Sequence, residues 1–439
     1  MKKIITLKSH KSKSLNGIIT VPGDKSISHR SIMLGSLCYG EVKIFGILEA
    51  TDVLDTIKVI KSLGIRIQKK KNYYKVFGNG GNFKKSSNFL DFGNSGTGVR
   101  LMIGMLSTKN MEVTFVGDES LSKRPMSRIT EPLKKFGVNI DDKKGLLPVK
   151  LKKSNFLFPN TIDIKIGSAQ IKSALILASL DLKGESLITE YFPSRNHTEL
   201  LLRHLGANIK IKKLKNKNVI KISGPNTLKP KNIVIPGDIS SAAFIIVACL
   251  LCENSKITIK SVGVNYLRTG IIDILIRMKG KVDILKSWEI NGEKFADISV
   301  RTSKLFGCNV ESNISTRLID EYPILFVAAC FAKGTTTFSN LKELQFKESD
   351  RLKTMAESLE KCGVKLKLGT GSLKIFGNEK QTGGANINTK NDHRIAMSML
   401  IFGLKSEKPI KVDKIDMIET SFPGFYKLLK KIGSKIEYI

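Results

Sequence analysis

Six stretches of the chain share one hydrophobic pattern, in which a small polar residue is followed by a long run of apolar and small residues. A polar N-cap ahead of such a run predicts an α-helix that is buried along most of its length. Neighbouring copies start 70 to 82 residues apart, so the sequence predicts six copies of one structural repeat. The six starts are Asp24, Asn94, Ser168, Asp238, Asp320 and Asp392.

A second marker keeps nearly the same period. In each copy a second predicted helix ends at a glycine, which can take the left-handed conformation that terminates helices. Alternating polar and apolar residues then predict strands. Each repeat is therefore expected to run strand, capped helix, strand, second helix and strands. The glycines are Gly64, Gly137, Gly206, Gly280, Gly363 and Gly433.

The first repeat illustrates the pattern. Residues 16–21 are strand-like, and Pro22-Gly23 turns the chain into the first helix. Thr51-Asp52 is predicted to cap the second helix, which Gly64 ends. Residues 73–77 alternate as a strand does.

A finer similarity divides the chain in half. VPGDKS at 21–26 and IPGDIS at 235–240 share Pro-Gly-Asp-x-Ser, which we interpret as two corresponding crossovers between domains. One domain is then expected to comprise residues 21–236, and the other residues 1–20 together with 237–439. Two chain crossings make a hinge, and hinged domains commonly close on ligands.

Composition excludes several classes of protein. Apolar residues make up 41% of the chain, yet the longest apolar run, 242–252, is too short to span a bilayer. The basic N-terminus contains no apolar signal segment, so we expect a soluble, cytoplasmic protein that does not associate with membranes. Cys249 and Cys252 lie inside an apolar helix, where they are expected to be buried small side chains. The sequence predicts neither a metal site nor a disulfide.

The net charge of +34 raises the question of a nucleic-acid partner. Only 13 of the 73 basic residues are arginine, and the lysines occur mostly in polar connections without interleaved aromatic residues. This pattern favours a solvated lysine-rich surface and no nucleic-acid partner. Seven arginines instead fall in motifs, which indicates small anions bound by bidentate guanidinium groups. They are Arg30, Arg100, Arg124, Arg128, Arg195, Arg351 and Arg394.

The predicted helix starts are candidate anion sites, because helix N-termini carry free N–H groups and partial positive charge. Asp238 is followed by no cation and is interpreted as an ordinary cap. Lys25 at a helix start is unfavourable unless an anion lies there. Arg124 and Arg128 would share a face if helical, as would Lys347 and Arg351.

At this point a family resemblance becomes clear. The motifs VPGDKSISHR, GNSGTGVR, LSKRPMSR, GSAQIKSA, SRNHTE, DEYP, KESDR, NDHRIAM and TSFPGF occur in the order typical of 3-phosphoshikimate 1-carboxyvinyltransferases, or EPSP synthases. The resemblance covers nearly the whole chain. It implies enolpyruvyl transfer from phosphoenolpyruvate to the 5-hydroxyl of shikimate 3-phosphate in aromatic amino-acid biosynthesis, by a monomer that uses no cofactor. It also implies that glyphosate inhibits the protein. The implied fold is a two-domain inside-out α/β barrel with three βαβαββ repeats in each domain.

The resemblance assigns roles by matched motif. Asp320 would take the proton of the 5-hydroxyl, and Glu348 and Lys25 are candidates for protonating the enol carbon. An alcohol that adds to an enol ether does need a base at its hydroxyl and an acid at the methylene carbon. The residues implied for shikimate 3-phosphate are Lys25, Ser26, Arg30, Ser168, Gln170, Arg195, Asp320 and Lys347. The residues implied for phosphoenolpyruvate are Lys25, Gly96, Arg128, Gln170, Arg351 and Arg394.

Some positions depart from the family pattern, and two alternatives remain. Ala169, Gln345 and Thr420 replace a serine, an arginine and a lysine found in other members, which affects fine contacts but not the reaction. Enolpyruvyl transferases for UDP-N-acetylglucosamine have Lys-Asn where this chain has Lys25-Ser26. They usually also carry a cysteine in the loop before the phosphoenolpyruvate arginine, and residues 109–130 of this chain contain none. An RNA-end-processing protein on a related fold predicts arginines and aromatic residues on an exposed stripe.

Overall fold

The computed structural model describes residues 5–84, 87–215 and 217–439, so the first four residues of the predicted 1–20 segment lie outside the described residues. Within these ranges the strands form six four-stranded sheets of one design. In the third sheet, for example, β10 (Thr161–Ile164) pairs parallel to β11 (Gly184–Glu190). An antiparallel hairpin of β13 (Lys217–Gly224) and β12 (Ile209–Leu214) completes the sheet. One sheet therefore corresponds to each predicted repeat.

Tertiary contacts divide the chain into two bodies. Body 2 comprises Gly23–Ile235 and the short segment Glu289–Glu293, and body 1 comprises the remaining residues. These limits lie within two residues of the boundaries predicted at 21 and 236. The segment Glu289–Glu293 is the difference, because the sequence analysis placed it in the other domain. That the bodies are domains which close on ligands stays a prediction.

In body 2 the first helix of each repeat forms the centre. Helices α1 (Lys25–Leu37), α3 (Gly96–Leu106) and α6 (Ala169–Ser179) are buried over almost their whole length, as their apolar runs predict. The other helices are α2 (Thr51–Ser62), α4 (Glu119–Ser122), α5 (Ser127–Lys134) and α7 (His197–His204). The other strands are β3 (Tyr39–Phe45), β4 (Arg66–Lys69), β5 (Tyr73–Asn79), β6 (Phe89–Asp91), β7 (Val113–Val116), β8 (Ile140–Lys143), β9 (Leu146–Leu151) and β14 (Ile233–Val234).

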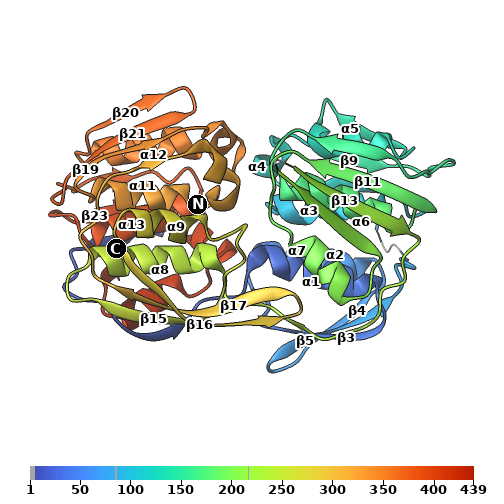
Figure 1. Ribbon diagram of the computed structural model, residues 1–439, viewed down its shortest axis with the longest axis horizontal. Coiled ribbons are helices and arrows are strands. Elements are labelled where there is room, and N and C mark those ends of the chain that lie inside the picture. The colour runs from blue at the N-terminus through green and yellow to red at the C-terminus, as the bar shows by residue number, and fades with distance from the viewer. Residues whose placement is uncertain (1–4, 85–86, 216) are drawn as a thin grey trace. The chain divides into compact units, whose positions relative to one another are not determined.

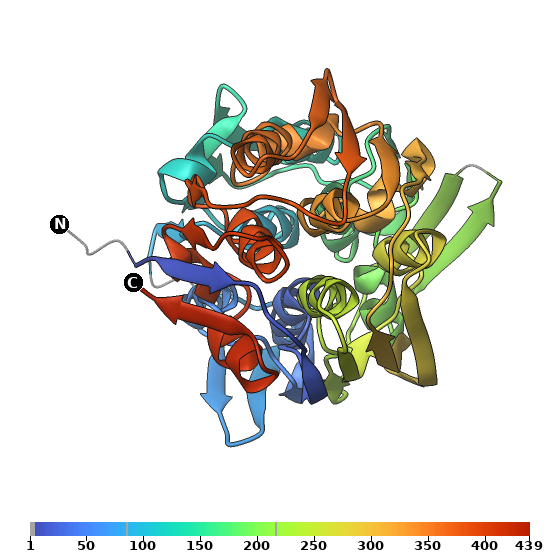
Figure 2. The same cartoon turned by 90° about the vertical axis from the view of Figure 1, so that its left-hand side faces the viewer.

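Body 1 repeats this plan around α8 (Ile239–Leu251), α11 (Tyr322–Cys330) and α13 (His393–Gly403) (Figure 1). Figure 2 shows these helices inside and the strands outside, which is the inside-out arrangement that the resemblance implies. The other helices are α9 (Gly270–Arg277), η1 (Ser312–Ile314), α10 (Ser315–Leu318), η2 (Lys342–Phe346), α12 (Arg351–Lys361), η3 (Ile415–Thr420) and α14 (Phe425–Lys431). The strands are β1 (Leu7–His10), β2 (Asn16–Thr20), β15 (Lys256–Gly263), β16 (Lys281–Ile290), β17 (Glu293–Arg301), β18 (Asn309–Val310), β19 (Gly334–Phe338), β20 (Leu366–Gly369), β21 (Ser372–Gly377), β22 (Asn386–Ile387), β23 (Ile410–Val412) and β24 (Lys435–Tyr438).

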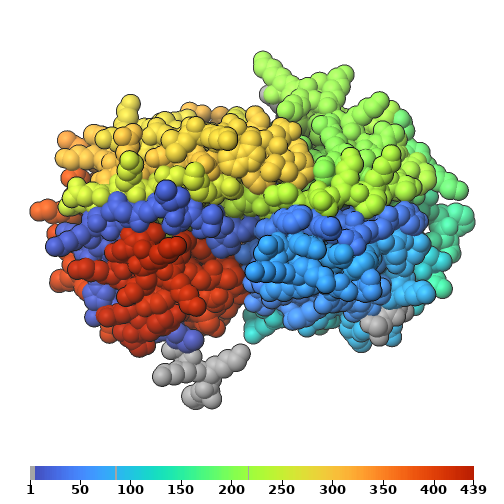
Figure 3. Space-filling view, turned by 90° about the horizontal axis from the view of Figure 1, so that it is seen from below, coloured from blue at the N-terminus to red at the C-terminus, as the bar shows by residue number. Residues whose placement is uncertain are grey.

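Three strands join sheets far from their place in the sequence. Strand β2 precedes α1 but pairs with β15 in the fourth sheet, whereas β14 pairs with β3 in the first sheet. Strand β1 inserts between β23 and β24, and the space-filling view shows the blue N-terminal segment beside the red C-terminal residues (Figure 3). At the first crossover, a Cβ on Gly23 would lie 1.8 Å from the carbonyl oxygen of Gly46, so only glycine fits this turn.

Several predicted caps were displaced. Helix α3 is capped by Ser95, whose hydroxyl accepts from the amide of Gly98, and not by Asn94. Helix α11 has no side-chain cap and starts two residues after Asp320. The predicted Thr51-Asp52 cap is also wrong, because α2 follows Ala50 without a capping side chain. In each case the polar side chain that was displaced from capping contacts another part of its body, as the next subsection shows.

Five of the six repeat glycines have the expected left-handed backbone, with φ of +85° at Gly64 and +86° at Gly206. Gly280 is the exception, and the prediction for it was wrong. There the left-handed residue is Lys279, with φ of +67°, so the helix ends one residue earlier. Close contact explains a glycine at 280 nonetheless, since a Cβ would lie 2.8 Å from the carbonyl oxygen of Leu275.

The expectations from composition hold where the structure tests them. Cys249 and Cys252 are buried, unpaired thiols in α8, and burial raises the pKa of each to about 12. Their burial is as predicted, and a raised pKa makes a thiol a poor redox or metal-binding group. Among the helices of the described ranges, none combines the length and the apolar character needed to cross a bilayer.

The displaced helix end predicts opposite effects for two substitutions. Lys279→Gly should raise the free energy of unfolding by roughly 0.5–1 kcal/mol, because glycine tolerates positive φ. Gly206→Ala should lower it by about 1 kcal/mol, since its Cβ would meet Lys229 only at 3.7 Å and the backbone carries the strain. Urea unfolding curves measure both. A loss of stability in Lys279→Gly would contradict this explanation of the helix end.

Candidate active site

Lys25 and Asp52 form an ion pair in the first of two polar clusters, which lies in body 2. Lys25 is the first residue of α1, and its Nζ lies 3.0 Å from Oδ2 of Asp52 near the start of α2. Both side chains are largely buried. Asp52 therefore supplies the negative charge that a lysine at a helix start requires, and the predicted capping role hid this function. Ser26 follows on the same turn of α1, and its carbonyl accepts from Nη1 of Arg30 at 2.9 Å.

Arg30 connects three helices of body 2. Its Nε donates to Oγ1 of Thr198 on α7 at 2.7 Å, and its Nη2 donates to Oγ of Ser173 on α6 at 2.8 Å. Burial lowers the pKa of the guanidinium to about 10, although Glu199 and Asp24 act in the opposite direction. Arg30 therefore stays protonated at neutral pH, and its orientation is fixed by hydroxyl groups.

The start of α3 joins this cluster through α6. Gln170 receives a hydrogen bond from Nη1 of Arg100 at 3.0 Å, and its Nε2 donates to Thr97 at 3.0 Å. Ser168, immediately before α6, caps that helix by accepting from the amide of Ile171. The sequence analysis assigned Gln170 and Ser168 to substrates, whereas it named Arg100 among the motif arginines without assigning it to a substrate. The signal for Arg100 was its position within GNSGTGVR.

Gly96 lies against two guanidinium groups. A Cβ at this position would be 2.9 Å from Nη1 of Arg100 and 3.1 Å from Nη1 of Arg124. Arg124 is buried and donates to the side chain of Asn94 at 2.5 Å. It lies between α4 and α5, whereas Arg128 is on α5, so the two arginines do not share one helix face as expected. The structure brings Arg124 to Gly96.

His29 links the starts of α1, α2 and α3. Its Nδ1 lies 2.8 Å from Oγ1 of Thr56, and that oxygen lies 2.8 Å from the point where a Cβ on Gly98 would stand. Burial, and then the charges of Lys25 and Arg30, lower the pKa of His29 to about 3. The imidazole is therefore neutral at physiological pH, and it adds no further positive charge to this crowded cluster.

Asp320 is the centre of the second cluster, in body 1. Its Oδ1 lies 3.4 Å from Nζ of Lys347 and 3.5 Å from Nη1 of Arg351. Lys347 follows η2 and Arg351 starts α12, so a loop rather than a common helix face brings them together. Nη1 of Arg394, on α13, donates to the carbonyl of Asp320 at 3.0 Å. Two cations that the resemblance implied therefore lie beside the Asp320 carboxylate, and a third donates to its backbone carbonyl.

Arg351 is almost completely buried among carboxylates. It pairs with Glu348, and its Nε donates to Oδ2 of Asp392 at 2.9 Å. Burial alone would lower the pKa of Arg351, but Asp392, Glu348 and Asp320 together raise it above its ordinary value. Asp392 also accepts from the amide of Arg394 at 2.9 Å, so this N-cap anchors two arginines at once.

A network that the sequence analysis missed lies at the start of α8. Asp238 caps this helix as predicted, but Nη2 of Arg268 also lies 3.2 Å from its Oδ1. The same nitrogen donates to Ser240 at 2.8 Å, and Ser240 in turn donates to Glu321. Glu321 directly follows Asp320. The N-cap of α8 therefore supports the segment that carries Asp320, although no cation follows it in the sequence.

The remaining expected positions are placed as follows. Arg195 lies on the loop between β11 and α7, and its charge acts on Arg30. Thr420, which replaces a lysine of other members, bonds back to the carbonyl of Met417 at 2.7 Å. The structure thus groups the site residues in two clusters, one in each body.

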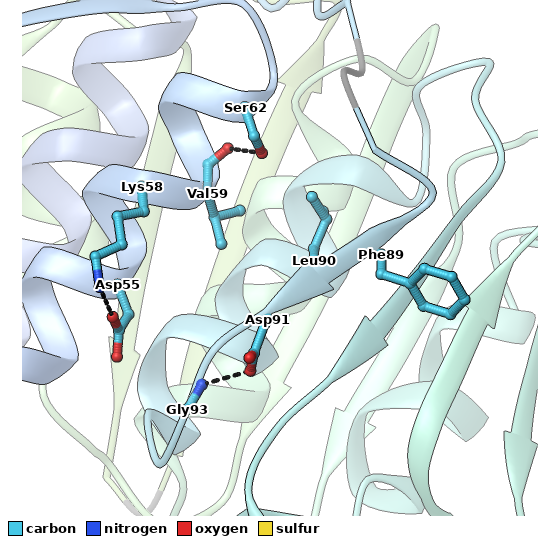
Figure 4. A pocket seen from close by; sticks show the side chains of 8 residues that line it. All are labelled: Asp55, Lys58, Val59, Ser62, Phe89, Leu90, Asp91 and Gly93. Carbon is cyan, nitrogen blue, oxygen red and sulfur yellow. Dashed lines mark hydrogen bonds and ion pairs between the residues drawn. The ribbon is translucent and has the colours of Figure 1, made fainter.

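A pocket of about 280 Å³ is separate from both clusters. It lies between α2 and β6, and Figure 4 shows Lys58 paired with Asp55 while the ring of Phe89 points away from the other side chains. None of its lining residues is an expected site residue. In the part of the chain that the structure describes, no group of three or more His, Cys, Asp or Glu side chains could hold a metal ion.

Comparisons with known proteins agree with the motifs. The profile of the family described as EPSP synthase (3-phosphoshikimate 1-carboxyvinyltransferase) matches residues 9–429. The 3-phosphoshikimate 1-carboxyvinyltransferase of Bartonella henselae is 44% identical, covering 99% of this chain and 100% of that protein. The enzyme of the same name from Ruthia magnifica is 42% identical, with 97% of each chain covered.

Solved structures give the same result. EPSP synthase from Acinetobacter baumannii superposes with a TM-score of 0.87 at 37% identity, covering 99% of this chain and 100% of that one. The enolpyruvyl transferase NikO from Streptomyces tendae superposes with a TM-score of 0.81 over 99% of each chain. At 17% identity the latter likeness supports the fold alone.

The neutral state of His29 predicts a specific loss of stability in acid. Its folded pKa of about 3 lies below the ordinary value of 6.5, so the unfolded chain binds a proton first as the pH falls. The contribution of neutral His29 to the free energy of unfolding is fully present above pH 6.5. It is lost as the pH falls toward 3, by at most about 1.4 kcal/mol per pH unit. His29→Gln, which keeps a hydrogen-bonding group, should flatten the stability curve in this range. Parallel curves for the two proteins, measured by urea unfolding at pH 7, 6, 5 and 4, would contradict the prediction.

Proposed function

Because the chain belongs to the EPSP synthase (3-phosphoshikimate 1-carboxyvinyltransferase) family, we propose that its two clusters act together on one pair of substrates. The chain is a transferase that moves the enolpyruvyl group of phosphoenolpyruvate to the 5-hydroxyl of shikimate 3-phosphate and releases phosphate. This step belongs to the shikimate pathway. The observation that carries the proposal for the site is the gathering of buried arginines at helix N-termini in each body.

The cluster around α1 and α6 receives shikimate 3-phosphate in this proposal. Arg30, Lys25 and Arg195 supply positive charge, and the N-termini of both helices offer backbone N–H groups to phosphate oxygens. The hydroxyl groups that orient Arg30 support a fixed guanidinium, which lowers the entropy lost when the phosphate binds. Ser26, Ser168 and Gln170 add neutral donors at the same helix starts.

Phosphoenolpyruvate is received by arginines from both clusters. Arg351 and Arg394 are held by Asp392 and by the carbonyl of Asp320, so their positions are set before the substrate arrives. In body 2, Gly96 leaves room beside Arg100 and Arg124, which we add to the set implied by the resemblance. Gln170, bonded to Arg100, connects the two substrates. Arg128 remains a prediction of the sequence alone.

The proposed chemistry is addition followed by elimination. Asp320 removes the 5-hydroxyl proton as the oxygen attacks C2 of phosphoenolpyruvate, and Glu348 or Lys25 delivers a proton to C3. The tetrahedral intermediate then loses a proton from its new methyl group, the bond from C2 to the phosphate oxygen breaks, and phosphate leaves. Lys347, 3.4 Å from Asp320, holds the acceptor beside its base. None of these steps requires a cofactor. A cytoplasmic, monomeric enzyme is also part of the proposal.

Asp320→Asn should bind shikimate 3-phosphate but lose turnover by roughly 10²-fold or more, because the amide cannot accept the hydroxyl proton. Phosphate release measures turnover, and calorimetry measures binding. Asp416→Asn, an exposed change in the same body, is the matched control and should leave both unchanged. Turnover within threefold of the parent would remove Asp320 from its proposed role.

The same assay tests the acceptor. Phosphate release should require shikimate 3-phosphate together with phosphoenolpyruvate, and replacing the acceptor by UDP-N-acetylglucosamine should abolish it. Release with the amino sugar at a comparable rate would favour the alternative transferase instead.

The same conservative substitution should have different effects on phosphoenolpyruvate binding at Arg124 and at Arg128. Arg124→Lys should raise the KM for phosphoenolpyruvate about tenfold, because lysine cannot reproduce a bidentate contact beside Gly96. Arg128→Lys should change this KM less than Arg124→Lys does. Steady-state kinetics at saturating shikimate 3-phosphate measure both. The reverse order would return the role to Arg128, as the sequence motif implied.

A further inference from the structure

The hairpin of β16 and β17 is shared between the two bodies. Most of its length belongs to body 1, yet its tip, Glu289–Glu293, belongs to body 2. The turn is Asn291-Gly292, with φ of +47° and +81°, the residue pair that tight hairpin turns prefer. The tip is therefore a well-defined turn, and its contacts in body 2 call for an explanation.

Two contacts fasten the turn to body 2. The Asn291 side chain accepts from the amide of Val234 at 2.9 Å and donates to its carbonyl at 3.2 Å. A Cβ on Gly292 would lie 3.6 Å from Leu200 of α7, so the turn packs directly against this helix. The contact with Leu200 places the turn on α7, the helix that follows Arg195 of the proposed phosphate site.

Glu293 extends the contact to the start of α7. Its side chain is 1% exposed, and its Oε1 lies 2.5 Å from Nδ1 of His197, which is 2% exposed. His197 is the first residue of α7, two residues after Arg195, and the next residue, Thr198, accepts the hydrogen bond from Arg30. Glu293 and Arg195 both act electrostatically on Arg30. A carboxylate from the hairpin thus lies among the phosphate-binding cations.

We propose that Glu293 is a positioning residue for shikimate 3-phosphate, which fixes His197 and thereby the start of α7. Through this contact the hairpin tip orients Arg195 and Thr198, and Thr198 in turn orients Arg30. The proposal rests on the phosphate-binding roles proposed above. It assigns a role in acceptor binding to a segment that carries none of the family motifs noted in the sequence, although Glu293 does not itself touch the substrate.

The central experiment compares Glu293→Gln with Glu289→Gln. Both substitutions remove one carboxylate from the same tip, but Glu289 is exposed and provides the matched control. Glu293→Gln should raise the KM for shikimate 3-phosphate about tenfold, the scale of a lost charge-assisted hydrogen bond. Its kcat and its KM for phosphoenolpyruvate should stay within about twofold. Asn291→Ala, which releases the turn from Val234, should act in the same direction.

The chain supplies its own reporter of the hairpin fold. Trp288, the only tryptophan in the sequence, lies just before the tip and stacks on Phe295 with ring centroids 5.9 Å apart. An unchanged emission spectrum shows that the hairpin has kept its fold in a variant. If Glu293→Gln does not fold, Glu293→Asp replaces it, because the shorter side chain keeps the charge but withdraws the carboxylate from Nδ1 of His197.

The outcomes separate the possible roles. An unchanged KM for shikimate 3-phosphate in a folded variant overturns the proposal, and so does a lower KM, which would mean that the carboxylate merely opposes the phosphate. Equal losses in kcat and both KM values would indicate general destabilisation and also overturn it. Arg195→Lys tests the underlying function: if it leaves this KM unchanged, the proposed phosphate site fails, whereas a raised KM with no effect of Glu293→Gln refutes only the positioning role.

Discussion

Burying a cation without an opposite charge costs several kcal/mol, and both clusters are built around this constraint. Lys172 is completely buried, and its Nζ lies 3.0 Å from Glu190 and 2.8 Å from Glu199. Arg351 is likewise enclosed by Asp392, Glu348 and Asp320. These carboxylates offset the cost of burying the cations and hold them in one orientation before a substrate enters. An anionic substrate then meets donors that are already in place, which is the condition under which electrostatic stabilisation is most effective.

The repeats use the same structural position for different purposes. The caps Asp24 and Asp238 occupy corresponding places ahead of α1 and α8. After Asp24 the chain presents Lys25 and Ser26 to the proposed phosphate site. After Asp238 it presents Ile239 and Ser240, and the serine joins Arg268 in supporting Glu321. In our proposal one helix start serves substrate binding, whereas its counterpart supports the neighbour of the proposed base, so two copies of one backbone plan carry different side-chain roles.

The features that sequence alone predicted are those that depend on local periodicity. The apolar runs of α1, α3 and α6 identify buried helices because every face of these helices is covered by the core. The left-handed residue at Lys279 was missed because the sequence pattern favours the adjacent glycine as the helix end. Gly280 is instead explained by its close contact with the carbonyl oxygen of Leu275. The roles of Asp52 and Glu293 were missed for another reason, since their partners are 27 and 96 residues away. Only the tertiary fold determines such pairs.

The insertion of β1 between β23 and β24 has a consequence for synthesis on the ribosome. Residues 7–10 are translated before body 2, whereas their partners in β23 and β24 are translated after it. Body 2, apart from the hairpin tip, has its residues available once residue 235 has emerged. The nascent chain thus carries β1 without its partners while body 2 can already fold, and the sheet that contains β1 forms only after β24 has emerged. Such long-range pairing slows folding, and it delays the assembly of body 1 relative to that of body 2.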